Sequence, residues 1–153
     1  MKITEILSAD MVVPEVGGTT KPQVLRELAR PLATRYRELD LAAICAVLME
    51  RERLGSTAIG DGIAIPHGKM AGIKQILGTF GRHQHGVDFE SLDGRPTHLF
   101  FVLVAPEDST SLHLKALARV SRLFKDGSFR ERLMAAKDAE EIFRLIVEED
   151  ARY

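Results

Sequence analysis

The sequence has 153 residues, of which 45% are hydrophobic and 28% are charged, as in one ordinary soluble globular domain. Disordered chains, collagen-like fibres and coiled-coil rods have other compositions and are excluded. Lysine and arginine number 21 against 22 aspartates and glutamates, a net charge of −1, so the basic surface that binds nucleic acid is not expected.

The chain lacks the apolar segments that mark membrane and secreted proteins. Its longest apolar run, from Leu41 to Met49, is far shorter than the roughly 18 residues of a membrane span. The first residues also lack the apolar stretch of about 7 to 15 residues found in a signal peptide. Cys45 is the single cysteine and is expected in the core, without a reactive role. We therefore expect a cytoplasmic protein.

The first part of the chain predicts a short amphipathic turn, a short strand ending near Val13 and two helices. The first helix is expected from about Lys21 to Tyr36, and Pro31 should kink or divide it. The second begins at Leu41 and buries one apolar face. The residues expected to cap these helices are the N-caps Thr20 and Asp40 and the C′ residue Gly55.

Short strands are expected in the middle of the chain. Ala58-Ile59 and Ile63-Ala64-Ile65 form two of them, joined by a tight turn at Gly60-Asp61-Gly62. A further strand is expected from Ile73 to Phe80, and Asp93-Gly94 is a strong turn signal.

The continuous apolar run from Leu99 to Val104, ended by Pro106, predicts a central strand covered on both faces. A helix capped by Ser109 or Asp108 follows, with positions 113, 117, 120 and 124 in one inward stripe. Two more helices are expected at about Ser128 to Ala136 and Asp138 to Glu148. The expected class is α/β, with a mixed central sheet flanked by helices on both faces in one domain.

The most distinctive segment is Ile63-Ala64-Ile65-Pro66-His67-Gly68, where an apolar strand leads to a histidine between a proline and a glycine. Pro66 restricts the backbone and Gly68 adds no bulk, so His67 should be held stiffly with its ring open to a large partner. Ligand sites of open α/β sheets lie at the carboxyl ends of strands, and imidazole with one free nitrogen is a nucleophile. The residues alone also allow a turn histidine that only binds a backbone carbonyl.

A spaced pattern surrounds this histidine: Glu52, six residues, Ile59-Gly60, two residues, and the segment containing His67. Together with LMERERLGSTAIGDG, DFESLDGRPTHLFFVLVAPED and SLHLKALARVSRLF, it resembles the phosphotransferase-system (PTS) enzyme IIA proteins of the fructose/mannitol class. The resemblance runs from about Ile3 to Val147 and is greatest to the nitrogen-regulatory branch. It implies a single PTS enzyme IIA type-2 domain over residues 1–153 with that family's fold.

The resemblance also implies roles for three residues. His67 matches the histidine that accepts a phosphoryl group from a histidine-containing phosphocarrier protein, His113 the second active-site histidine, and Arg51 the arginine near the phosphoryl group. No metal or organic cofactor is implied. The recipient would be a cysteine of a sugar-permease component or, in the nitrogen-regulatory branch, the phosphorylation state would regulate partner proteins.

Physical chemistry supports these roles but leaves alternatives open. Arg51 offers a planar fork to phosphoryl oxygens, although an arginine in the last turn of a helix also interacts with open carbonyls. His113 lies near a helix N-terminus, which favours neutral imidazole, and is expected to donate to the phosphoryl oxygens unless a nearby carbonyl satisfies it. Small and aliphatic residues should form the rim, with Gly68 and Gly62 allowing close approach of the partner.

Other kinds of site are weaker interpretations. His83, His85 and His98 could form a zinc site, but their spacing is not diagnostic. The glycine-rich stretch GSTAIGDG lacks the GK[ST] ending of a nucleotide loop, and the GxSxG pattern of a hydrolase is absent.

The main rival is a binding module whose docking is switched by phosphorylation at His67. Rapid passage of the phosphoryl group to a permease cysteine would mark a pathway enzyme, and a long-lived phosphoform with altered partner affinity would mark a regulator. No transport domain accompanies this domain in the sequence, which favours the regulator.

Overall fold

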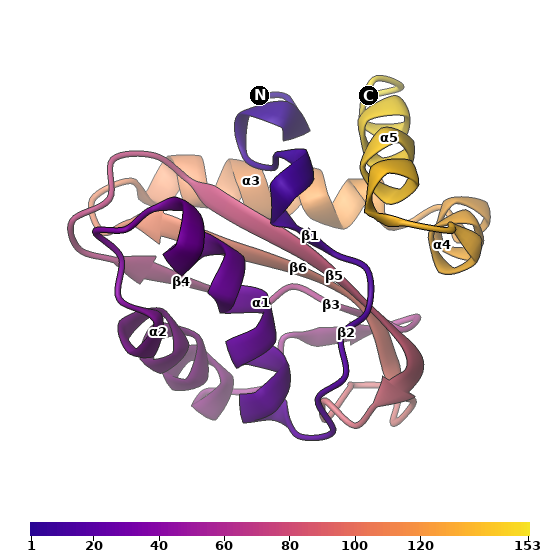
Figure 1. Cartoon of the computed structure of the whole chain (residues 1–153), viewed down its shortest axis with the longest axis horizontal. Helices are drawn as coiled ribbons and strands as arrows, with labels where there is room; N and C mark the ends of the chain where they lie inside the picture. The colour runs from indigo at the N-terminus through magenta and orange to yellow at the C-terminus, as the bar shows by residue number, and fades with distance from the viewer.

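A mixed sheet of six strands runs through the molecule, and the computed structural model describes it and the surrounding helices over residues 1–153 (Figure 1). The strands are β1 (Val12–Val13), β2 (Ala58–Gly60), β3 (Ile63–Ala64), β4 (His67–Met70), β5 (Leu77–Val87) and β6 (Thr97–Pro106). Their order is β1-β5-β6-β3-β2, and β4 pairs with β6 on the same edge as β3. β3 and β4 run parallel to β6, whereas β5 runs antiparallel to it, so the expected α/β class is confirmed.

Two short 3-10 helices, η1 and η2, precede β1, and five α-helices complete the chain. Their bounds are η1 (Ile3–Glu5), η2 (Ala9–Met11), α1 (Lys21–Arg35), α2 (Leu41–Arg53), α3 (Thr110–Leu123), α4 (Gly127–Ala135) and α5 (Ala139–Asp150). Both expected N-caps are confirmed, because Thr20 accepts from the amide of Gln23 and Asp40 from that of Ala43. These bonds satisfy amides that a helix start leaves open, which fixes where α1 and α2 begin.

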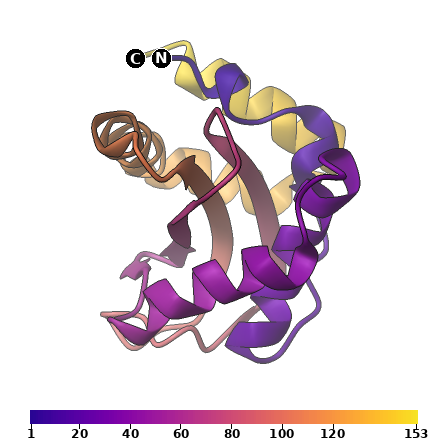
Figure 2. The same ribbon diagram turned by 90° about the vertical axis from the view of Figure 1, so that its left-hand side faces the viewer.

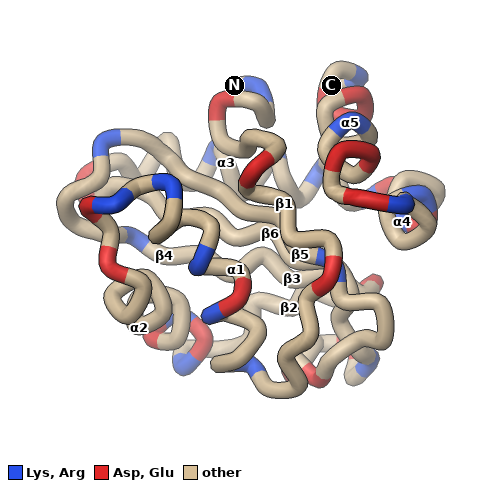
Figure 3. Tube along the Cα trace, viewed as in Figure 1, with Lys and Arg blue, Asp and Glu red and all other residues tan.

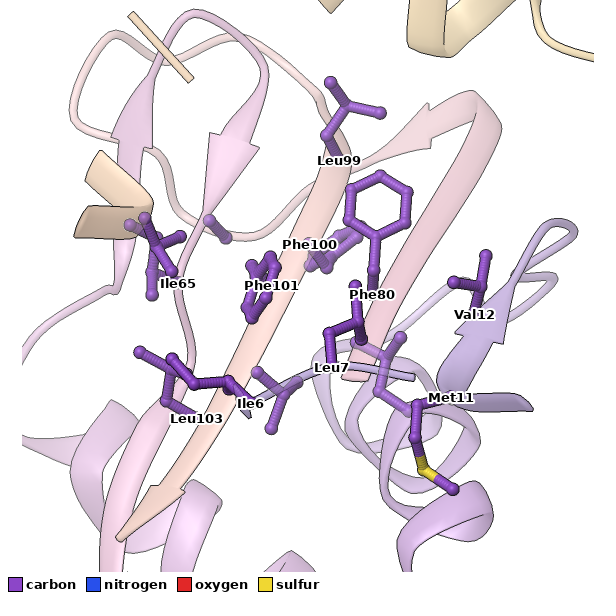
Figure 4. Packing of buried hydrophobic residues seen from close by; sticks show 14 of the residues in the cluster. Ile6, Leu7, Met11, Val12, Ile65, Phe80, Leu99, Phe100, Phe101 and Leu103 are labelled. Atoms are coloured by element: carbon purple, nitrogen blue, oxygen red, sulfur yellow. The ribbon is translucent and has the colours of Figure 1, made fainter. Parts of the chain in front are cut away.

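The helices cover both faces of the sheet, with α1 and α2 on one side and α3 on the other (Figures 1 and 2). Adjacent residues of β5 face the two helical layers in turn. Gly81 lies against Leu28 of α1, where an added Cβ would come within 2.3 Å of the leucine methyl group. Phe80 points the opposite way and stacks on Phe124 at the end of α3, with ring centroids 6.0 Å apart. Figure 4 shows Phe80 and Phe101 among the core side chains.

Two expectations about the elements were wrong in part. Pro31 lies inside α1 without dividing it, since Leu28 and Leu32 on either side are both buried and outweigh one missing hydrogen bond. The strand expected from Ile73 to Phe80 is instead Leu77–Val87. In its second half, Arg82 and Val87 pair with β6 across a register shift, and Arg82 and His83 are buried despite their polarity.

The segment before His67 also differs from expectation. The expected strand at residues 63–65 stops at Ala64, and the chain resumes pairing with β6 at His67, which is therefore the first residue of β4. Pro66 interrupts the two short strands because it has no amide hydrogen to donate. Ser109 occupies the N-cap position of α3, but its hydroxyl donates to the Pro106 carbonyl and accepts nothing from the helix.

Charged residues of both signs are scattered over the helices and loops, with no face of a single sign in the view of Figure 3. None of the helices combines the length and apolar character needed to cross a bilayer.

Candidate functional site

A hollow of about 740 Å³ opens between α2, β4 and the N-terminal end of α3. β4, α2 and the N-terminal end of α3 lie towards the left of Figure 1. The hollow gathers all three residues singled out by the sequence, which come from separate elements: its lining is Ala46, Val47, Glu50, Arg51, Leu54, His67, Gly68, Lys69, Thr110, His113, Leu114 and Leu117.

His67 lines the hollow, and the backbone two residues before it holds its ring. Its Nδ1 lies 2.7 Å from the carbonyl oxygen of Ile65. A carbonyl only accepts, so Nδ1 carries the proton and donates, and Nε2 keeps a lone pair. Burial lowers the pKa of His67 below its ordinary value, and the charge of Arg51 lowers it further, against the opposing effects of the Ile65 carbonyl and the Glu52 carboxylate. The ring is therefore neutral at pH 7, with Nε2 available as a nucleophile.

His113, the fourth residue of α3, faces His67. The two rings meet edge to face, with centroids 5.3 Å apart and planes 75° apart. Only 6% of His113 is exposed, and its buried Nδ1 has no hydrogen-bond partner, so no neighbouring carbonyl satisfies that atom. Burial lowers the pKa of His113, and the charges of His67 and Lys69 lower it further, which is the direction expected for a neutral ring.

Arg51 lies in the last turn of α2 and lines the hollow. Its Nη1 donates to the carbonyl oxygen of Gly55, 2.8 Å away, just past the helix end. The two interpretations of this arginine are therefore compatible, because one face of the guanidinium binds the helix terminus while the residue borders the site. No carboxylate lies within 4.0 Å of its nitrogens, unlike the arginines that form ion pairs elsewhere in the chain.

Glu52, the first residue of the spaced pattern, points away from the hollow into the protein. Its carboxylate accepts from the amide and the hydroxyl of Thr57 and from Lys21 Nζ, the last at 3.1 Å. Buried charges need such partners. The contacts tie the end of α2 to α1 and to the segment before β2, and thereby fix the helix turn that carries Arg51.

Gly62 does not lie at the hollow, whereas Gly68 lines it and also has a packing role. A Cβ on Gly68 would stand 2.4 Å from Val47 Cγ1, so the glycine allows α2 to pack closely on β4. Gly62 lines a different depression, formed with residues of α4, and its φ of 77° serves the turn between β2 and β3. The expected aliphatic rim is present, since Leu54 is 81% exposed and Leu114 is 61% exposed at the edge of the hollow.

Lys69 and Thr110 border the hollow but were missed in the sequence. Lys69 Nζ donates to Thr110 Oγ1 at 2.8 Å, which joins β4 to the first residue of α3. Strand alternation could have identified Lys69, because residues two apart on a strand share a face and His67 begins β4.

The zinc site considered for His83, His85 and His98 is not formed. No group of three histidine, cysteine, aspartate or glutamate side chains is placed to hold a metal ion. His83 uses both ring nitrogens, one on the carbonyl of Gly18 and one on the amide of Gly86. His98 Nδ1 contacts the backbone carbonyl of His83 at 3.0 Å.

Comparison with known proteins identifies the family. Residues 5–149 match the family model described as phosphoenolpyruvate-dependent sugar phosphotransferase system, EIIA 2. The chain belongs to the PTS EIIA 2 family. Membership covers nearly all of the sequence, and the elements that build the hollow all lie within the matched residues.

Relatives of this EIIA 2 chain include free-standing and larger proteins. A nitrogen regulatory protein of Bradyrhizobium diazoefficiens is 41% identical over 146 residues, which cover 95% of each chain. The fructose-specific EIIABC component of Bacillus subtilis is 37% identical over 150 residues, 98% of this chain but 24% of that protein. The crystal structure of the nitrogen regulatory protein IIA-Ntr from Neisseria meningitidis superposes with a TM-score of 0.87 at 38% identity, over 94% of this chain and 98% of that one.

Proposed function

We propose that this protein is a phosphoryl-accepting PTS enzyme IIA of the nitrogen-regulatory type, in which His67 takes the phosphoryl group from a histidine phosphocarrier. The observation that carries the proposal is the free Nε2 of His67, which results from the bond between Nδ1 and the Ile65 carbonyl. The free-standing nitrogen regulatory relatives support the regulatory assignment.

The transfer needs no further reactant. The lone pair of His67 Nε2 forms a bond to phosphorus while the bond from phosphorus to the donor's imidazole nitrogen breaks, and that electron pair returns to the donor. His67 keeps its Nδ1 proton, and the Ile65 carbonyl stabilises the positive charge that develops on the ring. The protein supplies position and charge stabilisation, which dominate in phosphoryl transfer.

Arg51 and His113 are proposed to hold the phosphoryl oxygens. Arg51 brings a positive charge without a carboxylate partner, and His113 brings a neutral ring 5.3 Å from His67. The exposed Leu54 and Leu114 provide an apolar rim on which the phosphocarrier can dock and then leave. The phosphorylation state of His67 then alters the charge of this rim and with it the affinity for regulated partner proteins.

The test is incubation of the full chain with the phosphocarrier system and phosphoenolpyruvate, followed by intact-mass measurement and site mapping. We expect one acid-labile phosphoryl group, on His67. A phosphoryl group mapped to another residue, or none at all, would contradict the proposal.

A second candidate is a sugar-specific enzyme IIA that passes the phosphoryl group to a permease cysteine. The 37% identical domain within the fructose-specific EIIABC component favours it. The fate of the phosphoryl group separates the two candidates. Rapid loss of phosphoryl to a cysteine-bearing permease component would support this second function, whereas a persistent phosphoform with changed affinity for regulated proteins would support the first.

A further inference from the structure

Lys69 is a second cation at the border of the hollow, and the proposed function gives it no role. We infer that Lys69 is a further catalytic residue, whose ammonium contacts the phosphoryl group carried by His67. This inference rests on the proposed function of His67 as the phosphoryl acceptor. In the unphosphorylated protein, the Lys69 ammonium binds only the neutral hydroxyl of Thr110; in the phosphorylated protein, it would bind the phosphoryl group.

The sheet places Lys69 on the same side as His67. In register with β6, His67 lies opposite Leu103 and Lys69 lies opposite Ala105, so one residue separates them and both side chains line the hollow. Two residues of a strand span about 6.6 Å. The four-carbon stem of lysine is long enough to return over that distance to a group attached to His67 Nε2.

The charge count of the site calls for a second cation. A phosphoryl group on histidine brings close to two negative charges and three acceptor oxygens. His113 is neutral at pH 7, which leaves Arg51 as a single positive charge among the proposed ligands. With Lys69 the hollow supplies two positive charges and one donor for each of the three oxygens, while its one carboxylate, Glu50, is paired with Arg53 Nη1 at 2.8 Å.

Lys69 is free to take this part because no carboxylate holds it. Neither Lys69 nor Arg51 forms an ion pair. The ion pairs of the chain are formed by Lys21 and by other arginines. Its single hydrogen bond, to Thr110 Oγ1 at 2.8 Å, is to a neutral acceptor at the mouth of the hollow. A phosphoryl oxygen carries negative charge and attracts the ammonium electrostatically, which the neutral Thr110 hydroxyl does not, so the phosphoryl group displaces Thr110.

The test compares Lys69→Met and Lys69→Arg with the wild type and with Lys74→Met, which removes an exposed lysine outside the hollow. We expect Lys69→Met to lower the maximal rate of His67 phosphorylation by about 10- to 100-fold, as for the loss of one charge-assisted hydrogen bond. Lys69→Arg should restore most of the rate, and Lys74→Met should leave it unchanged. The phosphocarrier concentration at half-maximal rate should change little in all variants.

An NMR titration of His113 in the unphosphorylated protein gives a second measurement. Since the charge of Lys69 contributes to the lowered pKa of His113, Lys69→Met should raise that pKa and Lys69→Arg should not. Wild-type phosphorylation on His67 with an unchanged rate in Lys69→Met would overturn the inference and leave the proposed function standing. An effect confined to the half-maximal phosphocarrier concentration would also overturn it, because it would indicate docking alone. Failure of the wild type to be phosphorylated on His67 would overturn the proposed function itself.

Discussion

Charged groups have ionic partners at the corner where η1 contacts α5, whereas the cations of the hollow have none. At this terminal corner, formed by Ile3, Arg119, Glu149 and Asp150, the buried Asp150 accepts from the Ile3 amide at 2.9 Å and from Arg119 Nε at 2.7 Å. In the hollow, Arg51 and Lys69 have no carboxylate partner and a buried nitrogen of His113 has no partner at all. Satisfied charges stabilise the fold, whereas unsatisfied ones are available to a ligand.

The sharpest test of this contrast is His67→Gln, with His85→Gln as a control that removes an exposed histidine of β5. We expect His67→Gln to abolish phosphorylation completely, since glutamine has no nitrogen lone pair of comparable nucleophilicity. The thermal midpoint should stay close to that of the wild type. Phosphorylation of His67→Gln at the wild-type level, read by intact mass, would show that His67 is not the acceptor.

The terminal corner should respond in the opposite sense. Asp150→Ala leaves the Ile3 amide and Arg119 Nε without their acceptor, and we expect the free energy of unfolding to fall by about 2 to 3 kcal/mol. Glu148→Ala removes only an exposed pair with Arg144 and should change it by less than about 0.5 kcal/mol. Urea unfolding measures both. Phosphorylation of folded Asp150→Ala should proceed at the wild-type rate, and a large loss would mean that the two regions are coupled.

The smallest expected effect concerns pH. The pKa values of His67 and His113 are lowered from 6.5, so the unfolded chain binds protons before the folded one as the pH falls. Stability should therefore be full above pH 6.5 and decline as the pH falls towards the lowered folded-state values. Asp10 and Asp93 also have lowered pKa values, but these lie below 3.8 and act only in stronger acid.

The double variant His67→Gln/His113→Gln checks the origin of this decline. Denaturant unfolding between about pH 7 and pH 5 should show a flatter profile in the variant than in the wild type. An equally steep decline in both proteins would assign the pH dependence to other groups.

Local signals accounted for much of the fold. The caps at Thr20 and Asp40, the turn around Asp61 and the buried strand of β6 depend on neighbours in the chain, and all were predictable from it. The second half of β5 was not, because Arg82 is buried only through carbonyl acceptors at Pro14, Leu133 and Ala136, far away in sequence. Polar residues with distant partners give no local sign of burial.

The candidate site, too, was predictable where local sequence signals exist and not where tertiary packing decides. His67, His113 and Arg51 were singled out by a motif and a resemblance, and the structure brings them to one hollow. The packing role of Gly68 could not be predicted, because its close neighbour Val47 is on another element. The absence of a partner for His113 Nδ1 likewise follows only from tertiary packing.

The bond from His67 Nδ1 to the Ile65 carbonyl fixes the tautomer of the proposed acceptor histidine without another side chain. Catalytic histidines oriented by a remote carboxylate depend on the placement and ionisation of that second side chain. A backbone carbonyl two residues away can be neither mutated nor protonated under physiological conditions. The tautomer of His67 should therefore survive side-chain substitutions and partner-induced shifts elsewhere in the protein, as long as the three-residue segment from Ile65 to His67 keeps its shape.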